Sequence, residues 1–228
     1  MALTITNDQA GRAVPPQVRI IARDFILSRL GSLFAFAPLG VWTLGHLWHQ
    51  LAAYQSGEAW EREVEHHGSD AGAILTFAVV LIPLLWHTVW GIGRMFKSRP
   101  AVANHGFSNI RYMVQRLSAI GLLLFLGAHL YLAWFEPRFL EHHAESFDAL
   151  AHEMHFNMPT LIVYVLGTLA IAYHLANGLW SFLSMGWGIT VSKSALSWME
   201  KVSLLFFFVL LVIGWAAVYG LYAGGAAA

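Results

Sequence analysis

Four histidines lie inside apolar stretches of the sequence, and they are the residues best suited to carry chemistry. They are His46, His87, His129 and His174, and the run 166–191 around the last of them carries no charged residue. A titratable imidazole at membrane depth is costly unless a partner holds it, so each position is a candidate functional site. Neutral imidazole is also a common metal ligand. The four histidines are therefore candidate metal ligands.

The composition indicates a multi-span membrane protein. The chain has 228 residues, of which 57% are hydrophobic and 11% charged, outside the usual profile of a soluble domain. The formal net charge is zero, which gives no sign of a nucleic-acid partner. There is no cysteine, which excludes disulfides, thiolate-bound zinc, protein-ligated iron–sulfur clusters and covalently attached c-type haem. Any redox group must be held by histidine, methionine or carboxylate side chains.

Five apolar runs are each long enough to cross about 30 Å of hydrocarbon as a helix. They lie near residues 30–54, 71–96, 113–135, 158–184 and 198–222. The sequence thus predicts an all-α membrane protein with five transmembrane helices, the first four of which form a histidine-containing core. We expect three segments: a cytoplasmic N-terminal segment 1–29 with a short amphipathic helix from residue 17, the membrane domain 30–222, and an outer C-terminal tail 223–228.

The distribution of basic residues predicts the orientation. Of the 13 lysines and arginines, all but Arg62 and Arg138 precede the first run, or lie between or at the facing ends of the second and third or the fourth and fifth runs. The positive-inside rule then places the N-terminus in the cytoplasm and the C-terminus outside. The N-terminal sequence has no apolar core of the kind found in signal peptides, so we expect it to remain in the cytoplasm.

Because successive helices run in opposite directions, the four histidines should fall at two depths. His46 and His129 lie about 24 Å beyond the inner starts of their helices, whereas His87 and His174 lie about as far from the outer starts. Two imidazole pairs at two depths are what two bis-histidine haems b would require. Because two protein ligands fill both axial positions of an iron, this arrangement favours electron transfer over oxygen chemistry.

Other residues near these depths could serve the same group. A macrocycle lying against a helix needs small neighbours, and Gly45, Gly91, Gly127 and Gly178 lie close to the histidines, although glycines also serve helix packing alone. Donors to the propionates of the inner haem would be Arg29, Ser32, Arg111, Gln115 and Arg116. The three arginines could equally reflect topology and contacts with lipid phosphate.

Four motifs containing these histidines resemble a known family. They are RLGSL at 29–33 leading through Pro38 and Gly40 to His46, LIPLLWHTVWGI at 81–92, VQRLSAIGLLLFLGAHLY at 114–131, and YHLANGLWSF at 173–182 followed by WGITV. Together they resemble the five-helix dihaem cytochrome b anchor of succinate:menaquinone oxidoreductases, the b558-type subunit of Gram-positive and some other bacteria. Quinol:fumarate reductase anchors are more distant relatives. The resemblance covers residues 25–222.

The resemblance implies the ligands, cofactors and partners. His46 and His129 would hold the outer haem b, and His87 and His174 the inner one, which are the pairs reached from topology. Family members sit in the bacterial cytoplasmic membrane, where they anchor an iron–sulfur subunit and an FAD-containing flavoprotein, and they exchange electrons with menaquinone or another quinone. A higher oligomer of the complex is compatible with this arrangement.

Two positions bear on finer family properties. Some fumarate reductase anchors carry a glutamate two residues before the histidine of the fourth helix, in a proton route; this chain carries Ala172 there. That route is therefore in doubt. Some members also place an acidic residue at the quinol site near the outer start of the second helix, for which Glu61, Glu65 and Asp70 are candidates. For each of them taken singly, a solvated acidic loop is the simpler explanation.

Two alternatives remain open at this point. One is a dihaem quinone-reactive anchor of another respiratory complex, such as a nitrate reductase or a hydrogenase, which shares the histidine pattern but not HxxNGLWSF. The other is a haem-free transporter or proton relay that uses membrane histidines. The visible spectrum of the reduced protein separates the second alternative from the haem-containing ones.

Overall fold

The computed structural model describes residues 25–27, 29–67, 70–97, 107–143, 145–190 and 192–226. No strand occurs among these residues, and five helical stretches are long and apolar enough to cross a membrane. We call them spans I to V: Phe25–Tyr54, Ile74–Phe96, Ile110–Leu140, Met158–Ser184 and Lys193–Gly225. The predicted five-span all-α membrane fold is confirmed. Most of the expected N-terminal amphipathic helix lies outside the described residues.

The described elements are α-helices interrupted by short π-helical segments, written η. In chain order they are η1 Ala35–Gly40, α2 Val41–Gln50, α3 Ala52–Gln55, α4 Gly57–His67, α5 Asp70–Thr76, η2 Phe77–Leu81, α6 Ile82–Lys97, α7 Phe107–Leu130, η3 Tyr131–Leu140, α8 Phe147–Phe156, α9 Met158–Ser181, η4 Phe182–Gly186 and α10 Lys193–Gly225.

Span III continues beyond its expected end near residue 135, through Pro137, to Leu140. Proline has no N–H, so it cannot donate to Ala133 O as an α-helix would require. The segment adopts wider i→i+5 pairing, and the guanidinium of Arg138 also donates to that carbonyl, at 3.3 Å. In i→i+5 pairing Ala133 O faces the backbone N–H of Arg138, one residue beyond the proline, so this wider pairing lets the helix pass it.

Two helix starts are set by capping side chains. The Ser192 hydroxyl accepts a bond from Ala195 N at 3.1 Å, so α10 begins at Lys193, five residues before the expected start of the fifth run. Asn157 accepts from Thr160 N at 3.4 Å, and Pro159 occupies the first turn of α9, where its missing N–H costs nothing.

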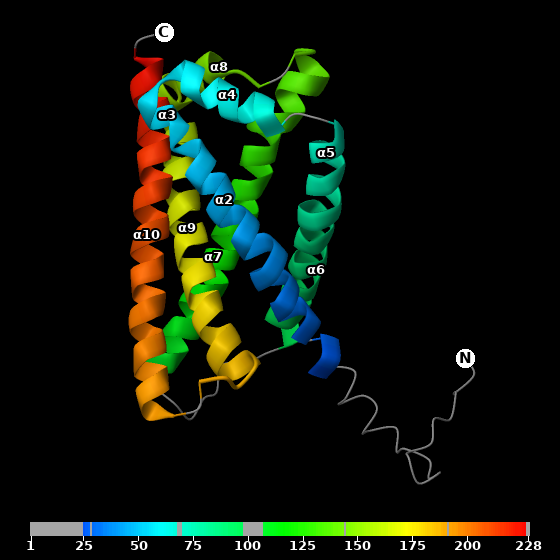
Figure 1. Cartoon of the computed structure of the whole chain (residues 1–228), viewed down its shortest axis with the longest axis vertical. Helices are drawn as coiled ribbons and strands as arrows, with labels where there is room; N and C mark the ends of the chain where they lie inside the picture. The colour runs from blue at the N-terminus through cyan, green and yellow to red at the C-terminus, as the bar shows by residue number, and fades with distance from the viewer. Residues whose placement is uncertain are drawn as a thin grey trace, which may run out of the picture.

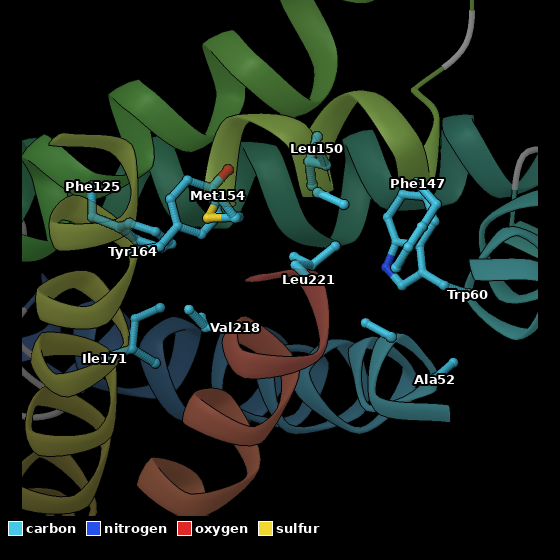
Figure 2. Close-up of a cluster of buried hydrophobic side chains, with 12 residues drawn as sticks. Ala52, Trp60, Phe125, Phe147, Leu150, Met154, Tyr164, Ile171, Val218 and Leu221 are labelled. Carbon is cyan, nitrogen blue, oxygen red and sulfur yellow. The ribbon is translucent and has the colours of Figure 1, made fainter. Parts of the chain in front are cut away.

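Short helices cover one end of the bundle. Figure 1 shows α3, α4 and α8 at the end where the C-terminus lies, and we call this end the cap end. Trp60 of α4 is 3% exposed and lies against Phe147 of α8, with ring centroids 6.0 Å apart. Figure 2 shows both rings beside Leu150, with Leu221 of α10 completing the cluster. Burial of these apolar side chains fixes the cap to the spans.

The spans pack unevenly. Helix α9 packs against both α7 and α10, while α6 packs against η1 of span I. In Figure 1, α10 lies on the side of the bundle away from α5 and α6. Close approach of α10 to α3 depends on Gly220, because a Cβ there would lie 2.5 Å from backbone atoms of Ala53 and Tyr54.

We expect Gly220→Ala to destabilise the bundle by about 1–3 kcal/mol, because backbone atoms cannot rotate away from the added methyl. Thermal unfolding of the detergent-solubilised protein measures the effect. Gly121→Ala is the matched control, because a Cβ there makes an ordinary 3.6 Å contact with Ala170. Equal melting temperatures for the two variants would contradict the close contact.

Candidate functional site

The structure brings the four membrane histidines together as two pairs. The ring centroids of His46 on α2 and His129 on α7 are 5.9 Å apart. Those of His87 on α6 and His174 on α9 are 6.2 Å apart. Imidazole nitrogens bind transition metals at about 2 Å, so two rings on opposite sides of one metal have centroids roughly 6 Å apart. Both pairs therefore have the spacing of axial ligands, although their ligand role stays a prediction.

The pairs lie at different heights in the bundle. His46 and His129 lie toward the cap end, where Phe125 and Tyr164 beside His129 join the apolar cluster that contains Met154 of α8. His87 lies toward the opposite end, where its Nδ1 is 3.4 Å from Gly31 O near the start of span I. Among the described residues, no group of three or more His, Asp or Glu side chains could hold a bare metal ion. Each pair offers two imidazole donors.

In three of the four histidines, Nδ1 faces a polar group on a neighbouring helix. His87 Nδ1 faces Gly31 O, His129 Nδ1 is 3.1 Å from the Tyr164 hydroxyl, and His174 Nδ1 is 3.3 Å from Ser118 Oγ. A partner on one ring nitrogen orients the ring and leaves Nε2 available to bind a metal. Histidines that ligate metals usually show this arrangement.

Four glycines near the histidines in the sequence have open space at their Cβ positions. A Cβ added at Gly45, Gly91, Gly127 or Gly178 would meet no non-neighbouring atom within 4 Å among the described residues. By contrast, a Cβ at Gly31 or Gly167 would clash with an aromatic ring. These glycines therefore make no close helix contact among the described residues. Gly91 and Gly178 lie one turn from His87 and His174 on the same helix faces, where a flat macrocycle would need room.

The predicted propionate donors have different surroundings. Arg111 lies with its Cζ 4.3 Å above the Trp180 ring and its Nη1 3.6 Å from Glu200 Oε1. Arg29 and Arg116 stack on aromatic rings of their own helices, Phe25 and Tyr112. Ser32 is partly buried in span I. Gln115 lies behind His174, where its amide nitrogen donates to His174 O at 3.2 Å. Their role toward a propionate stays a prediction.

The predicted quinone-site acids lie at the cap end. Glu61 on α4 accepts a bond from Phe147 N at 3.4 Å, which satisfies a free N–H in the first turn of α8. Glu65 belongs to α4 and Asp70 begins α5, but their side chains lie outside the described part of the structure. Glu63, also on α4, lies 2.6 Å from Nδ1 of His49. His49 is one helical turn beyond His46.

Several polar groups around the histidines were missed from sequence. Tyr164, Ser118 and Asn177 are buried near the pairs. The Trp180 Nε1–H is buried beside Arg111 without a hydrogen-bond partner among the described residues. The sequence signal that could have identified them is a polar residue within an apolar run. Asn177 and Trp180 also follow His174 by only three and six residues. An unpaired buried donor is costly and indicates that a further acceptor belongs there.

No family model matches the sequence. The chain is 28% identical over 201 residues to the succinate dehydrogenase cytochrome b558 subunit of Bacillus subtilis (strain 168). The match covers 86% of this chain and 96% of that protein. A match of this extent takes in all four histidines and agrees with the resemblance found from their motifs.

Proposed function

We propose that this chain is a cytochrome b membrane subunit of succinate dehydrogenase that carries electrons between an iron–sulfur subunit and a quinone through two bis-histidine haems b. The likeness to the b558 subunit supports the coarser assignment. The observation that carries the finer one is the two histidine pairs, drawn from four different spans, at 5.9 Å and 6.2 Å.

The chain's own residues would hold, orient and shield the two groups. His46 and His129 would hold the haem at the cap end, which we assign to the outer face, and His87 and His174 would hold the haem at the inner face. Bound haem iron supplies one-electron redox chemistry. The glycine-lined spaces would admit the macrocycles, and apolar neighbours such as Phe125 would exclude water from the rings.

The partners follow from what the chain lacks and where its charges lie. Without cysteine it cannot ligate iron–sulfur clusters, so those clusters and succinate oxidation would belong to the iron–sulfur subunit and the FAD-containing flavoprotein. They would dock on the cytoplasmic side, with the N-terminus inside and the C-terminus outside. The haem-binding domain would be residues 30–222, preceded by the cytoplasmic segment 1–29 and followed by the outer tail 223–228.

The quinone, menaquinone or another, would react near the cap end. Glu61, Glu65 and Asp70 remain candidates for its site, and all three belong to elements at that end. Some relatives carry a glutamate at the position of Ala172. In this chain Ala172 is fully buried against Leu47 and Leu210, and it offers no carboxylate there. We therefore propose quinone chemistry without that proton route.

Arg111 and Trp180 would bind a propionate of the inner haem. We expect Arg111→Gln to lower the reduction potential of the inner haem, because loss of a nearby positive charge favours the more positive ferric state. Because the bond to the propionate exists in both oxidation states, only part of its about 1.5–3 kcal/mol changes the reduction equilibrium, and we expect a shift of up to about tenfold. Spectroelectrochemical titration measures the shift. Arg62→Gln, on α4 at the cap end, should leave the inner potential unchanged; an equal inner shift in both variants would refute the assignment.

The function is tested on the purified complex. We expect dithionite to produce the α band of haem b and succinate to reduce a quinone through the complex. Turnover of nitrate or hydrogen in place of succinate would favour the anchor of another respiratory complex. A colourless but active preparation would favour the haem-free transporter.

A further inference from the structure

A buried polar cluster of four residues surrounds the inner end of α9. Ser118 and Asn177 are 7% and 9% exposed, which is unusual for polar side chains at membrane depth. Asn177 Nδ2 donates to Gln115 Oε1 at 2.8 Å, and Gln115 Nε2 donates to His174 O at 3.2 Å. The Ser118 hydroxyl donates to Gln115 O at 2.8 Å and lies 3.3 Å from His174 Nδ1. Every member contacts His174 or holds a residue that does.

The donors and acceptors of this cluster fix its orientation. A backbone carbonyl only accepts, so Gln115 must turn its amide nitrogen toward His174 O. That leaves its carbonyl toward Asn177, whose amide nitrogen donates to it. Because the hydrogen of the Ser118 hydroxyl is committed to Gln115 O, a lone pair of Ser118 Oγ is what faces His174 Nδ1.

Two tautomers of the neutral His174 ring compete in this setting. Gln115 Nε2 lies 3.3 Å from Nδ1, so a ring with its hydrogen on Nε2 could accept there. A ring with its hydrogen on Nδ1 can donate to Ser118 Oγ. Only the second state leaves Nε2 free for a metal, and it is the only one in which Ser118 has a hydrogen bond with the ring.

We propose that Ser118 is a positioning residue that holds His174 in the Nδ1–H state, directs Nε2 toward His87, and lowers the reduction potential of the inner haem. This inference rests on the proposed function. An acceptor on Nδ1–H makes the imidazole a stronger donor to its metal, which favours the more positive oxidation state. Gln115 and Asn177 hold Ser118 and the α9 backbone in place around it.

The test compares Ser118→Ala with Ser118→Thr in the purified complex, using spectroelectrochemical titration of both haems and the haem content per chain. In Ser118→Ala we expect the inner haem equilibrium to shift about tenfold toward the reduced state, ~59 mV for one electron. The outer potential should not move. Ser118→Thr keeps the hydroxyl and should restore the inner potential. Loss of the inner haem alone in Ser118→Ala, with recovery in Ser118→Thr, would also support the proposal.

A matched variant addresses the other pair. Tyr164→Phe removes the hydroxyl that faces His129 Nδ1 and should shift only the outer potential. The proposal is overturned if Ser118→Ala keeps the wild-type inner potential, or if Ser118→Thr behaves as Ser118→Ala does. A wild-type protein without two haems would instead refute the proposed function, so the two failures are distinguishable.

Discussion

His174→Ala should abolish the inner haem and leave the outer haem in place. The change removes one of two axial ligands from the His87/His174 pair, while the His46/His129 pair lies at the other height and keeps both rings. Haem content should fall to about half of the wild-type value, and succinate:quinone turnover should fall by more than about tenfold. Visible spectra with haem counted per polypeptide measure the first effect, and a turnover assay measures the second.

The control for this change is an exposed histidine at the cap end. His152 of α8 is exposed and its ring lies tilted against Phe156, with centroids 4.7 Å apart, so His152→Ala should keep both haems and full turnover. If His174→Ala retains both haems with unchanged potentials, the proposed pairing of His87 with His174 is wrong.

Gly178→Leu should exclude the inner haem without unfolding the protein. A Cβ at this position meets no non-neighbouring atom within 4 Å among the described residues, one turn beyond His174. A leucine would therefore occupy the space that we assign to the macrocycle, and inner haem occupancy should fall about tenfold or more. The melting temperature of the haem-depleted protein should be unchanged or higher, because an added apolar side chain fills open space.

The size of the side chain provides the internal control. Gly178→Ala adds only the Cβ and should retain most of the inner haem, so occupancy should fall in order of side-chain volume. Full occupancy in Gly178→Leu with a wild-type spectrum would show that this open space faces lipid rather than a cofactor.

Much of the fold follows from hydropathy. The five spans were predictable because a helix must satisfy its own backbone hydrogen bonds in lipid, and uninterrupted apolar runs mark where that happens. Alternating helix direction then predicted which histidines share a height, and the structure places the same rings near each other. These two features depend on one-dimensional spacing, which sequence records directly.

Features that depend on contacts between helices were not predictable. Helices α4 and α8 lie in polar loops, and their apolar faces are recognised only once Trp60 and Phe147 meet. Gln115 was predicted as a propionate donor from its depth, whereas its contacts place it behind His174. The extension past Pro137 uses i→i+5 pairing, to which the Arg138 side chain adds a bond to Ala133 O, and sequence rules for proline do not include this pairing.

The central claim is that four imidazoles from consecutive spans hold two haems at two heights. Its most direct test is a redox titration of the purified protein with haem counted per polypeptide. We predict two haems b per chain, reduced in two separable one-electron steps. A folded, active protein with no haem, or with one haem and a single step, would contradict it.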